Sequence, residues 1–179
     1  MKATGIVRRM DDLGRLVIPR EIRRTLRIRE GDPLEIFTAN DGEVILKKYS
    51  PLGELTSFAK DYAEALSKGT SLPVIITDRE QCIVVSGMPK KEILNRKVST
   101  ALEDVLTTRQ LSTFKKDDAK TLVPLEGVDN LAAIVAPIIS SGDIMGSVVF
   151  LQGASGNFSE TDSKLAQVAA AFLGNRTEE

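Results

Sequence analysis

The 179-residue sequence contains no histidine and only one cysteine, Cys82. These absences exclude a Ser-His-Asp or Cys-His nucleophile, a histidine-ligated zinc site, a four-cysteine cluster and an intrachain disulfide. Cys82 lies in an apolar stretch with no cationic neighbour in sequence, which favours a buried structural thiol over a reactive one. A lone thiol is typical of a reducing intracellular compartment. We expect no cofactor and no metal.

Long apolar runs are also missing. The longest run without a charged or strongly polar residue, Leu131 to Ile139, is too short to span a bilayer. The first five residues lack the apolar core of a signal peptide. The sequence therefore predicts a cytoplasmic protein with no membrane partner.

The formal net charge of −1 hides an uneven distribution of charge. Residues 1–29 carry nine basic and three acidic residues, a net charge of +6, and eight of the nine basic residues are arginine. Residues 51–179 carry a net charge of −4. Arginine is favoured where a planar guanidinium meets phosphate or a guanine edge. The basic N-terminal module is therefore the candidate site for a polyanionic partner.

The pattern of the first fifty residues predicts two strands, a helix and two more strands. The expected strands are residues 4–10, 15–18, 34–38 and 44–48, with tight turns at Asp11–Gly14 and Asn40–Gly42. Pro19 suits the start of the helix. A unit of about fifty residues buries too little apolar surface to be stable alone, so we expect it to oligomerise.

Within the expected helix, Ile22 and Leu26 have the spacing of a core-facing pair. On the opposite side one stripe holds four arginines, namely Arg20, Arg23, Arg24 and Arg27. A merely solvated helix face is the ordinary interpretation of such a charge run. That face normally interleaves glutamate with lysine, however, and Glu21 is the only acidic residue here, which favours a polyanion-binding helix.

These residues resemble the AbrB-like transition-state regulators of bacteria. The resemblance covers residues 1–50 and rests on five motifs: Gly5-Ile6-Val7-Arg8, Leu13-Gly14-Arg15-Leu16-Val17-Ile18-Pro19, Glu21-Ile22-Arg23-Arg24-Thr25-Leu26, Gly31-Asp32 and Ile45-Leu46-Lys47-Lys48-Tyr49. It implies an all-β-type swapped-hairpin barrel, in which two chains interleave into one dimeric DNA-binding domain. It also implies that Arg8, Arg15, Arg23 and Arg24 contact DNA. Arg9 and Arg20 are added from charge and spacing alone.

The rest of the chain predicts an α+β domain. An apolar helix is expected from residue 52 to Gly69, and its stripe suits either a core or a helix-bundle contact. Further expected elements are strands at 73–78 and 81–87, short helices at 90–96 and 100–108, a hairpin of 132–139 with 144–151, and a last helix. That helix starts at the N-cap Ser159, with Asp162 in a capping box, and carries Leu165, Val168, Ala169, Phe172 and Leu173 on one face. We divide the chain into residues 1–50, a linker helix at 51–70, and residues 71–179.

The C-terminal pattern resembles a GAF domain. The resemblance rests on Ala136-Pro137-Ile138, Gly142, Gly146 and Phe158-Ser159-Glu160-Thr161-Asp162. The resemblance implies small-molecule sensing and oligomerisation, with loops 87–89 and 125–130 as candidate ligand loops. The Asn-Lys-Phe-Asp-Glu set of cyclic-nucleotide GAF domains is absent, as are the cysteines of redox GAF enzymes, which argues against both chemistries.

An AbrB-like module followed by a GAF-like module resembles transcription factors of spore-forming bacteria. This resemblance implies a homotetramer that binds double-stranded DNA and both activates and represses late, forespore-type sporulation genes. An antitoxin is the alternative, but antitoxins with this barrel carry a short disordered tail, whereas residues 52–179 are patterned for folding. An enzyme is not expected, since the acidic pairs Asp11-Asp12 and Asp117-Asp118 have no accompanying ligand set.

Overall fold

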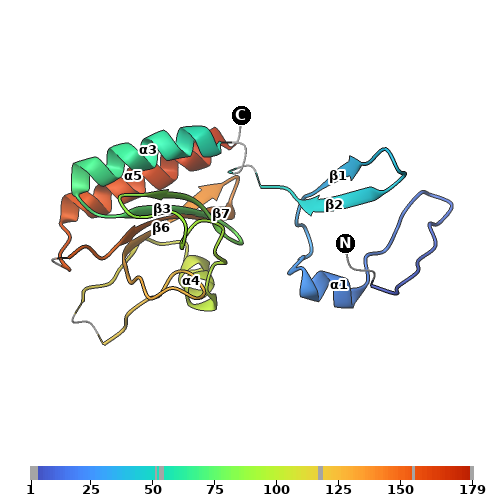
Figure 1. Ribbon diagram of the computed structural model, residues 1–179, viewed down its shortest axis with the longest axis horizontal. Coiled ribbons are helices and arrows are strands. Elements are labelled where there is room, and N and C mark those ends of the chain that lie inside the picture. The colour runs from blue at the N-terminus through green and yellow to red at the C-terminus, as the bar shows by residue number, and fades with distance from the viewer. Residues whose placement is uncertain (1–3, 51, 53–54, 117–118, 155, 178–179) are drawn as a thin grey trace. The chain divides into compact units, whose positions relative to one another are not determined.

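Two antiparallel sheets form in two separate compact units, Met1–Tyr49 and Ser50–Glu179 (Figure 1). The computed structural model describes residues 4–50, 52, 55–116, 119–154 and 156–177. Of the two acidic pairs, Asp117-Asp118 therefore lies outside the described residues. No helix within the described residues is long and apolar enough to cross a membrane.

The first unit contains helix α1 (Arg20–Thr25) and the hairpin of β1 (Leu34–Thr38) with β2 (Val44–Lys48). The two strands pair antiparallel from Leu34 opposite Lys48 to Thr38 opposite Val44. The turn closes where the Gly42 N–H donates to the Ala39 carbonyl at 3.1 Å. Both strands and the turn are confirmed as predicted from alternation and the Asn40–Gly42 signal.

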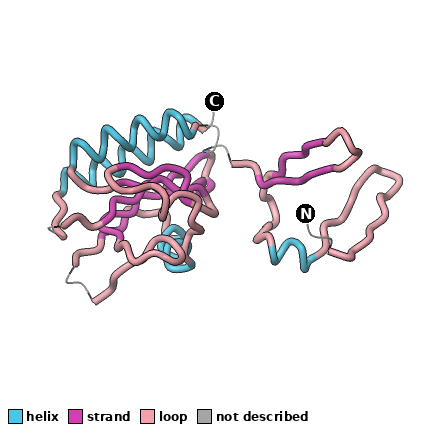
Figure 2. Tube along the Cα trace, viewed as in Figure 1, coloured by secondary structure: helices cyan, strands magenta, loops and turns pink. Residues whose placement is uncertain are grey.

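The strands expected at residues 4–10 and 15–18 are not formed within the chain. These segments make a hairpin-shaped loop instead (Figure 2). Its turn is closed by the Asp11 N–H donating to the Arg15 carbonyl at 3.1 Å and the Gly14 N–H donating to the Asp11 carbonyl at 3.1 Å. Among the described residues no strand pairs with either segment, so they gain no ladder hydrogen bonds.

The first unit has almost no interior of its own. Pro19 is the single buried residue among residues 4–49. Ile22 is half-buried and Leu26 is exposed, which corrects the expectation that α1 packs both against a core. The reason is that a two-stranded hairpin and one short helix provide no second layer to cover them. Val7 is 88% exposed and Ile36 is 66% exposed.

The second unit is built on a five-stranded sheet with the strand order β4-β3-β7-β6-β5. Its strands are β3 (Val74–Asp78), β4 (Cys82–Ser86), β5 (Ser112–Thr113), β6 (Ala132–Ser140) and β7 (Asp143–Leu151). The hairpins β3–β4 and β6–β7 lie where the sequence pattern predicts them. Strand β4 is therefore an edge of the sheet.

Helices cover both faces of this sheet. Helices α3 (Thr56–Thr70) and α5 (Glu160–Arg176) lie on one face, and α4 (Thr100–Thr107) lies below the other (Figure 1). Side chains alternate accordingly, because Val74 and Ile76 join the cluster with α3 and α5, while Ile75 joins the cluster with α4.

Helix α5 begins and packs through specific local contacts. The Ser159 hydroxyl accepts from the Asp162 N–H at 3.1 Å, and the Asp162 carboxylate accepts from the Ser159 N–H at 2.7 Å, so the predicted capping box is confirmed. A Cβ at Gly174 would lie 2.1 Å from the Ile139 carbonyl oxygen. Glycine therefore lets the helix approach β6 closely.

The helix expected at residues 90–96 is wrong, because the segment forms successive turns. Asn95 adopts a left-handed φ of 64°, which interrupts a right-handed helix. Its N–H donates to the Cys82 carbonyl at 2.8 Å, and the Cys82 N–H donates to the Arg96 carbonyl at 2.9 Å. In this segment, backbone hydrogen bonds to the start of β4 take the place of the hydrogen bonds that a helix would make.

Cys82 is fully buried, as the sequence predicts for a structural thiol. Its Sγ–H donates to the Val84 carbonyl at 3.3 Å. Burial raises the pKa of the Cys82 thiol to about 12. The reactive thiolate is therefore scarce at neutral pH.

Candidate nucleic-acid interface

A single carboxylate organises the turn that carries Arg15. Asp11 Oδ1 accepts from the backbone N–H groups of Leu13 at 3.0 Å and Arg15 at 2.7 Å. The other oxygen, Oδ2, accepts from Arg15 Nε at 2.7 Å. Asp11 thus shapes the turn and holds the Nε side of the Arg15 guanidinium. The terminal amino groups of Arg15 remain available to a partner.

Asp11 and Arg15 form their ion pair in contact with solvent, with side chains 37% and 70% exposed. Hydrogen bonds from the Arg15 backbone and side chain lower the pKa of the Asp11 carboxyl, and the Leu13 N–H adds to the effect. Because its pKa is lowered, the Asp11 carboxylate stays ionised at a pH where an ordinary carboxyl would take up a proton. The ion pair with Arg15 is lost only as the pH falls through the lowered pKa of Asp11. Exposed pairs contribute little stability, so we assign Asp11 a role in orientation.

Helix α1 presents the next three arginines. It starts after the buried Pro19, whose φ of −57° suits the first turn. Arg20, Arg23 and Arg24 are all exposed. Among the described residues none of the three has an acidic partner, so their charge is available to an incoming anion.

Helix α1 ends earlier than its charge pattern suggests, and Arg27 is not part of the stripe. The Ile28 N–H donates to the Arg23 carbonyl at 2.7 Å and the Arg27 N–H to the Arg24 carbonyl at 3.2 Å, which is a Schellman ending. Arg27 occupies its left-handed position with a φ of 52°, where glycine is usual. The Arg27 carbonyl also accepts a hydrogen bond from Lys48 Nζ.

The structure places all six predicted arginines, Arg8, Arg9, Arg15, Arg20, Arg23 and Arg24, in the first unit with exposed side chains. Three share α1, and the other three flank the turn at Asp11–Gly14. Sequence reasoning missed the role of Asp11. Its signal was an aspartate four residues before an arginine across a glycine-containing turn.

Exposed guanidinium groups on a short helix and a tight turn are suited to bind phosphate oxygens. Each guanidinium offers donors in a fixed planar arrangement and keeps its charge at any physiological pH. Among the described residues no group of three or more cysteine, aspartate or glutamate side chains is arranged to hold a metal ion.

Two families match consecutive parts of the chain. Residues 7–53 match the family described as "Antidote-toxin recognition MazE, bacterial antitoxin". Residues 54–178 match the family described as "Stage V sporulation protein T C-terminal, transcription factor".

Individual proteins extend this result. Stage V sporulation protein T of Bacillus subtilis (strain 168) is 50% identical over 181 residues, which covers 100% of both chains. The transition state regulatory protein AbrB of the same organism is 63% identical over 51 residues, 28% of this chain and 52% of AbrB. The GAF domain of an Acinetobacter phosphoenolpyruvate-protein phosphotransferase shares the fold over 74% of this chain and 84% of its own, with a TM-score of 0.55 and 12% identity.

The expected fold class is confirmed: an AbrB-type arginine-rich unit precedes an α+β GAF-like domain. These two parts define a two-domain transcription regulator. The chain belongs to the stage V sporulation protein T family of transcription factors.

Proposed function

We propose that this chain is a cytoplasmic, DNA-binding regulator that activates some late, forespore-type sporulation promoters and represses others. The observation that carries the proposal is the composition of the first unit's surface. It exposes six arginines together with most of its large apolar side chains. The arginines suit duplex DNA, and the apolar side chains suit a second copy of the same unit.

The dimer supplies the interior that one chain lacks. On the β1–β2 hairpin, Ile36 pairs with Leu46, and Val44 lies on the same face, with Ile36 and Val44 each 66% exposed. A second chain that contributes its own hairpin and loop would cover this face and provide pairing for residues 4–10 and 15–18. Burying each of these aliphatic side chains contributes about 1.5–3 kcal/mol.

A two-fold dimer doubles every arginine on its surface. Guanidinium groups from both chains neutralise phosphates, release counterions and fix the register of the protein on the duplex. The contacts come from a turn and a six-residue helix rather than from a long recognition helix. We therefore propose that recognition depends on DNA shape as well as on base edges.

The full-length protein is expected to bind a sporulation promoter fragment with strong salt dependence. Several phosphate contacts per dimer should reduce the affinity by about 10³ or more between about 50 and 200 mM salt. Fluorescence anisotropy across a salt series measures the slope, with a scrambled duplex of equal length as the control for selectivity. Weak binding that is indifferent to salt would contradict a phosphate-contacting interface.

We further propose that the second unit joins two dimers into a tetramer. Helices α3 and α5 carry a cluster of Phe58, Tyr62 and Phe172, whose ring centroids lie 5.6–6.1 Å apart. Phe172 is 42% exposed, and Leu165 and Val168 on the same helix are also exposed. An aromatic and aliphatic patch on paired helices is typical of a helix-bundle contact between subunits.

Replacing Phe172 with aspartate is expected to dissociate the tetramer into dimers. A charge at the centre of an apolar contact should weaken association by on the order of 30-fold or more. Sedimentation velocity of the full-length variant measures the change, and Phe172→Leu should keep the tetramer. A wild-type protein that sediments as a dimer, or an aspartate variant that remains tetrameric, would refute the assignment.

The antitoxin alternative is not favoured. The family match to MazE is confined to residues 7–53, and the rest of the chain folds into a sheet with its own buried core. An enzymatic role is not proposed either, because Asp11, the first residue of one candidate acidic pair, is engaged by the turn and by Arg15.

A further inference from the structure

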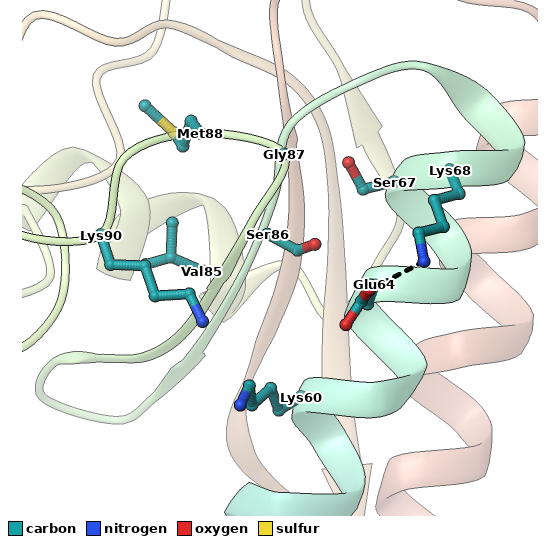
Figure 3. Close-up of a pocket in the computed structure, with 9 residues that line it drawn as sticks. All are labelled: Lys60, Glu64, Ser67, Lys68, Val85, Ser86, Gly87, Met88 and Lys90. Atoms are coloured by element: carbon teal, nitrogen blue, oxygen red, sulfur yellow. Dashed lines mark ion pairs between the residues drawn. The ribbon is translucent and has the colours of Figure 1, made fainter.

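A cavity of about 320 Å³ opens between helix α3 and the end of the edge strand β4 (Figure 3). Lys60, Glu64, Ser67 and Lys68 line it from α3. Val85, Ser86, Gly87, Met88 and Lys90 line it from β4 and the following loop. Of the two loops predicted as ligand loops, 87–89 contributes Gly87 and Met88, whereas 125–130 contributes no lining residue.

This cavity lies apart from the two sheet faces. The face below α4 is filled by buried side chains, including Ile75, Leu102 and Leu125. The face below α3 and α5 is filled by Ala63, Phe150 and others. The cavity instead occupies the margin where α3 passes the edge strand.

The charges of the cavity are unbalanced. Three ammonium groups, those of Lys60, Lys68 and Lys90, face one carboxylate, Glu64, which leaves a net charge of +2. Glu64 pairs with Lys68 at 2.8 Å. The hydrogen bond and charge of Lys68 lower the pKa of the Glu64 carboxyl, and the charges of Lys60 and Lys90 lower it further. All three lysines therefore place their positive charge around the same cavity.

Two hydroxyl groups complete the lining. The side chain of Ser67 is buried, with the residue 8% exposed, and its hydroxyl lines the cavity without a hydrogen-bond partner among the described residues. Ser86 is half-buried and lies on the opposite wall. No side-chain oxygen or nitrogen that is itself buried lacks a hydrogen-bond partner among the described residues, so the unpartnered Ser67 hydroxyl is open to the cavity and can donate to an acceptor that enters it.

Gly87 is what brings the two walls together. It adopts a φ of 77°, and a Cβ there would lie 2.2 Å from Ser67 Oγ and 3.2 Å from Pro73 Cα. A larger residue would displace the Ser67 hydroxyl, crowd Pro73 Cα and strain a backbone conformation that favours glycine. The close approach places the two serines at the floor of a shallow cavity whose charged rim, including Glu64 and Lys68, is exposed to solvent.

We infer that this cavity is a binding site for a small phosphate monoester. Lys60 and Lys90 neutralise the two phosphate charges, and the hydroxyls of Ser67 and Ser86 donate hydrogen bonds to its oxygens. The volume exceeds that of a phosphate group and leaves room for a small organic portion beside Met88. The site would serve as the sensing site of the second unit.

Isothermal titration of the full-length protein with glucose 6-phosphate tests this inference, with glucose at equal ionic strength as the uncharged control. Saturable binding is expected for the phosphate ester and not for glucose. The double variant K60Q/K90Q should bind at least about tenfold more weakly. The variant E64Q should bind several-fold more tightly, because it removes a competing negative charge and frees Lys68.

Two control variants distinguish binding in this cavity from nonspecific attraction of the phosphate ester to positive side chains. Lys91 is exposed and adjacent in sequence but does not line the cavity, so K91Q should bind like the wild type. The variant R23A/R24A should also bind like the wild type, because those arginines belong to the first unit. Absence of saturable binding, equal loss in K91Q, or loss in R23A/R24A would overturn the inference.

Discussion

Replacing Arg23 with alanine is expected to weaken promoter binding by about tenfold or more and to flatten its salt dependence. Arg23 is exposed on α1 and has no acidic partner among the described residues, so its charge is available to DNA. Each phosphate contact contributes about 0.9 to the slope of log K against log salt. Because a dimer carries two copies, the slope should fall by about 1.8.

Fluorescence anisotropy with the wild-type promoter fragment across a salt series measures both quantities. Lys164→Ala, which removes an exposed positive charge from α5 in the second unit, is the matched control and should leave the slope unchanged. Wild-type affinity and slope for Arg23→Ala would remove α1 from the DNA interface.

Replacing Ile36 with aspartate is expected to abolish dimerisation of the first unit and, with it, DNA binding. In a monomer this substitution at a 66%-exposed position should change stability by no more than about 0.5 kcal/mol. In a dimer whose interior includes Ile36, the buried carboxylate should cost several kcal/mol, because it would have no partner there. The size of the effect therefore distinguishes the two states.

Analytical ultracentrifugation and promoter binding of the full-length variant measure this loss, while circular dichroism should still report the folded second unit. Glu35→Gln on the neighbouring position of β1 is the control, since Glu35 lies on the opposite face of the hairpin. Unchanged sedimentation and binding for Ile36→Asp would show that the β1–β2 face is not part of the dimer interior.

Local signals predicted the elements that a single chain can complete. The hairpin of β1 and β2 follows from alternation around a turn with glycine at residue 42, and α5 follows from the capping box of Ser159 and Asp162. The β6–β7 hairpin follows from two apolar runs around Ser140–Asp143. In each case the sequence contains both partners of the contact that defines the element.

Elements that depend on distant or absent partners were not predictable in the same way. The segments at residues 4–10 and 15–18 have strand-like sequences but no pairing strand within the described chain. The end of α1 depends on Arg27 adopting a left-handed conformation that propensity assigns to glycine. The charge stripe alone gave no sign of that ending.

Helix α5 illustrates a further limit. The pattern placed Leu165, Val168, Ala169, Phe172 and Leu173 on one face, yet the helix buries Ala169 and Leu173 with Ala166 and Ala170 and leaves Leu165, Val168 and Phe172 exposed. Periodicity shows which side of a helix is apolar. It does not show which of those apolar residues pack into the chain's own core and which contact another subunit. For the cavity beside β4, the sequence indicated the loop at 87–89 but not the wall formed by α3, because tertiary packing at Gly87 joins the two walls.

Protein synthesis delivers the arginine-rich segment first, although that segment buries only Pro19 among its described residues 4–49. The later segment contains both buried clusters, and a single chain supplies all of their side chains. We therefore expect the second unit to fold before the first, although it is synthesised later. In the proposed dimer, the first unit completes its packing only when two copies of the chain meet.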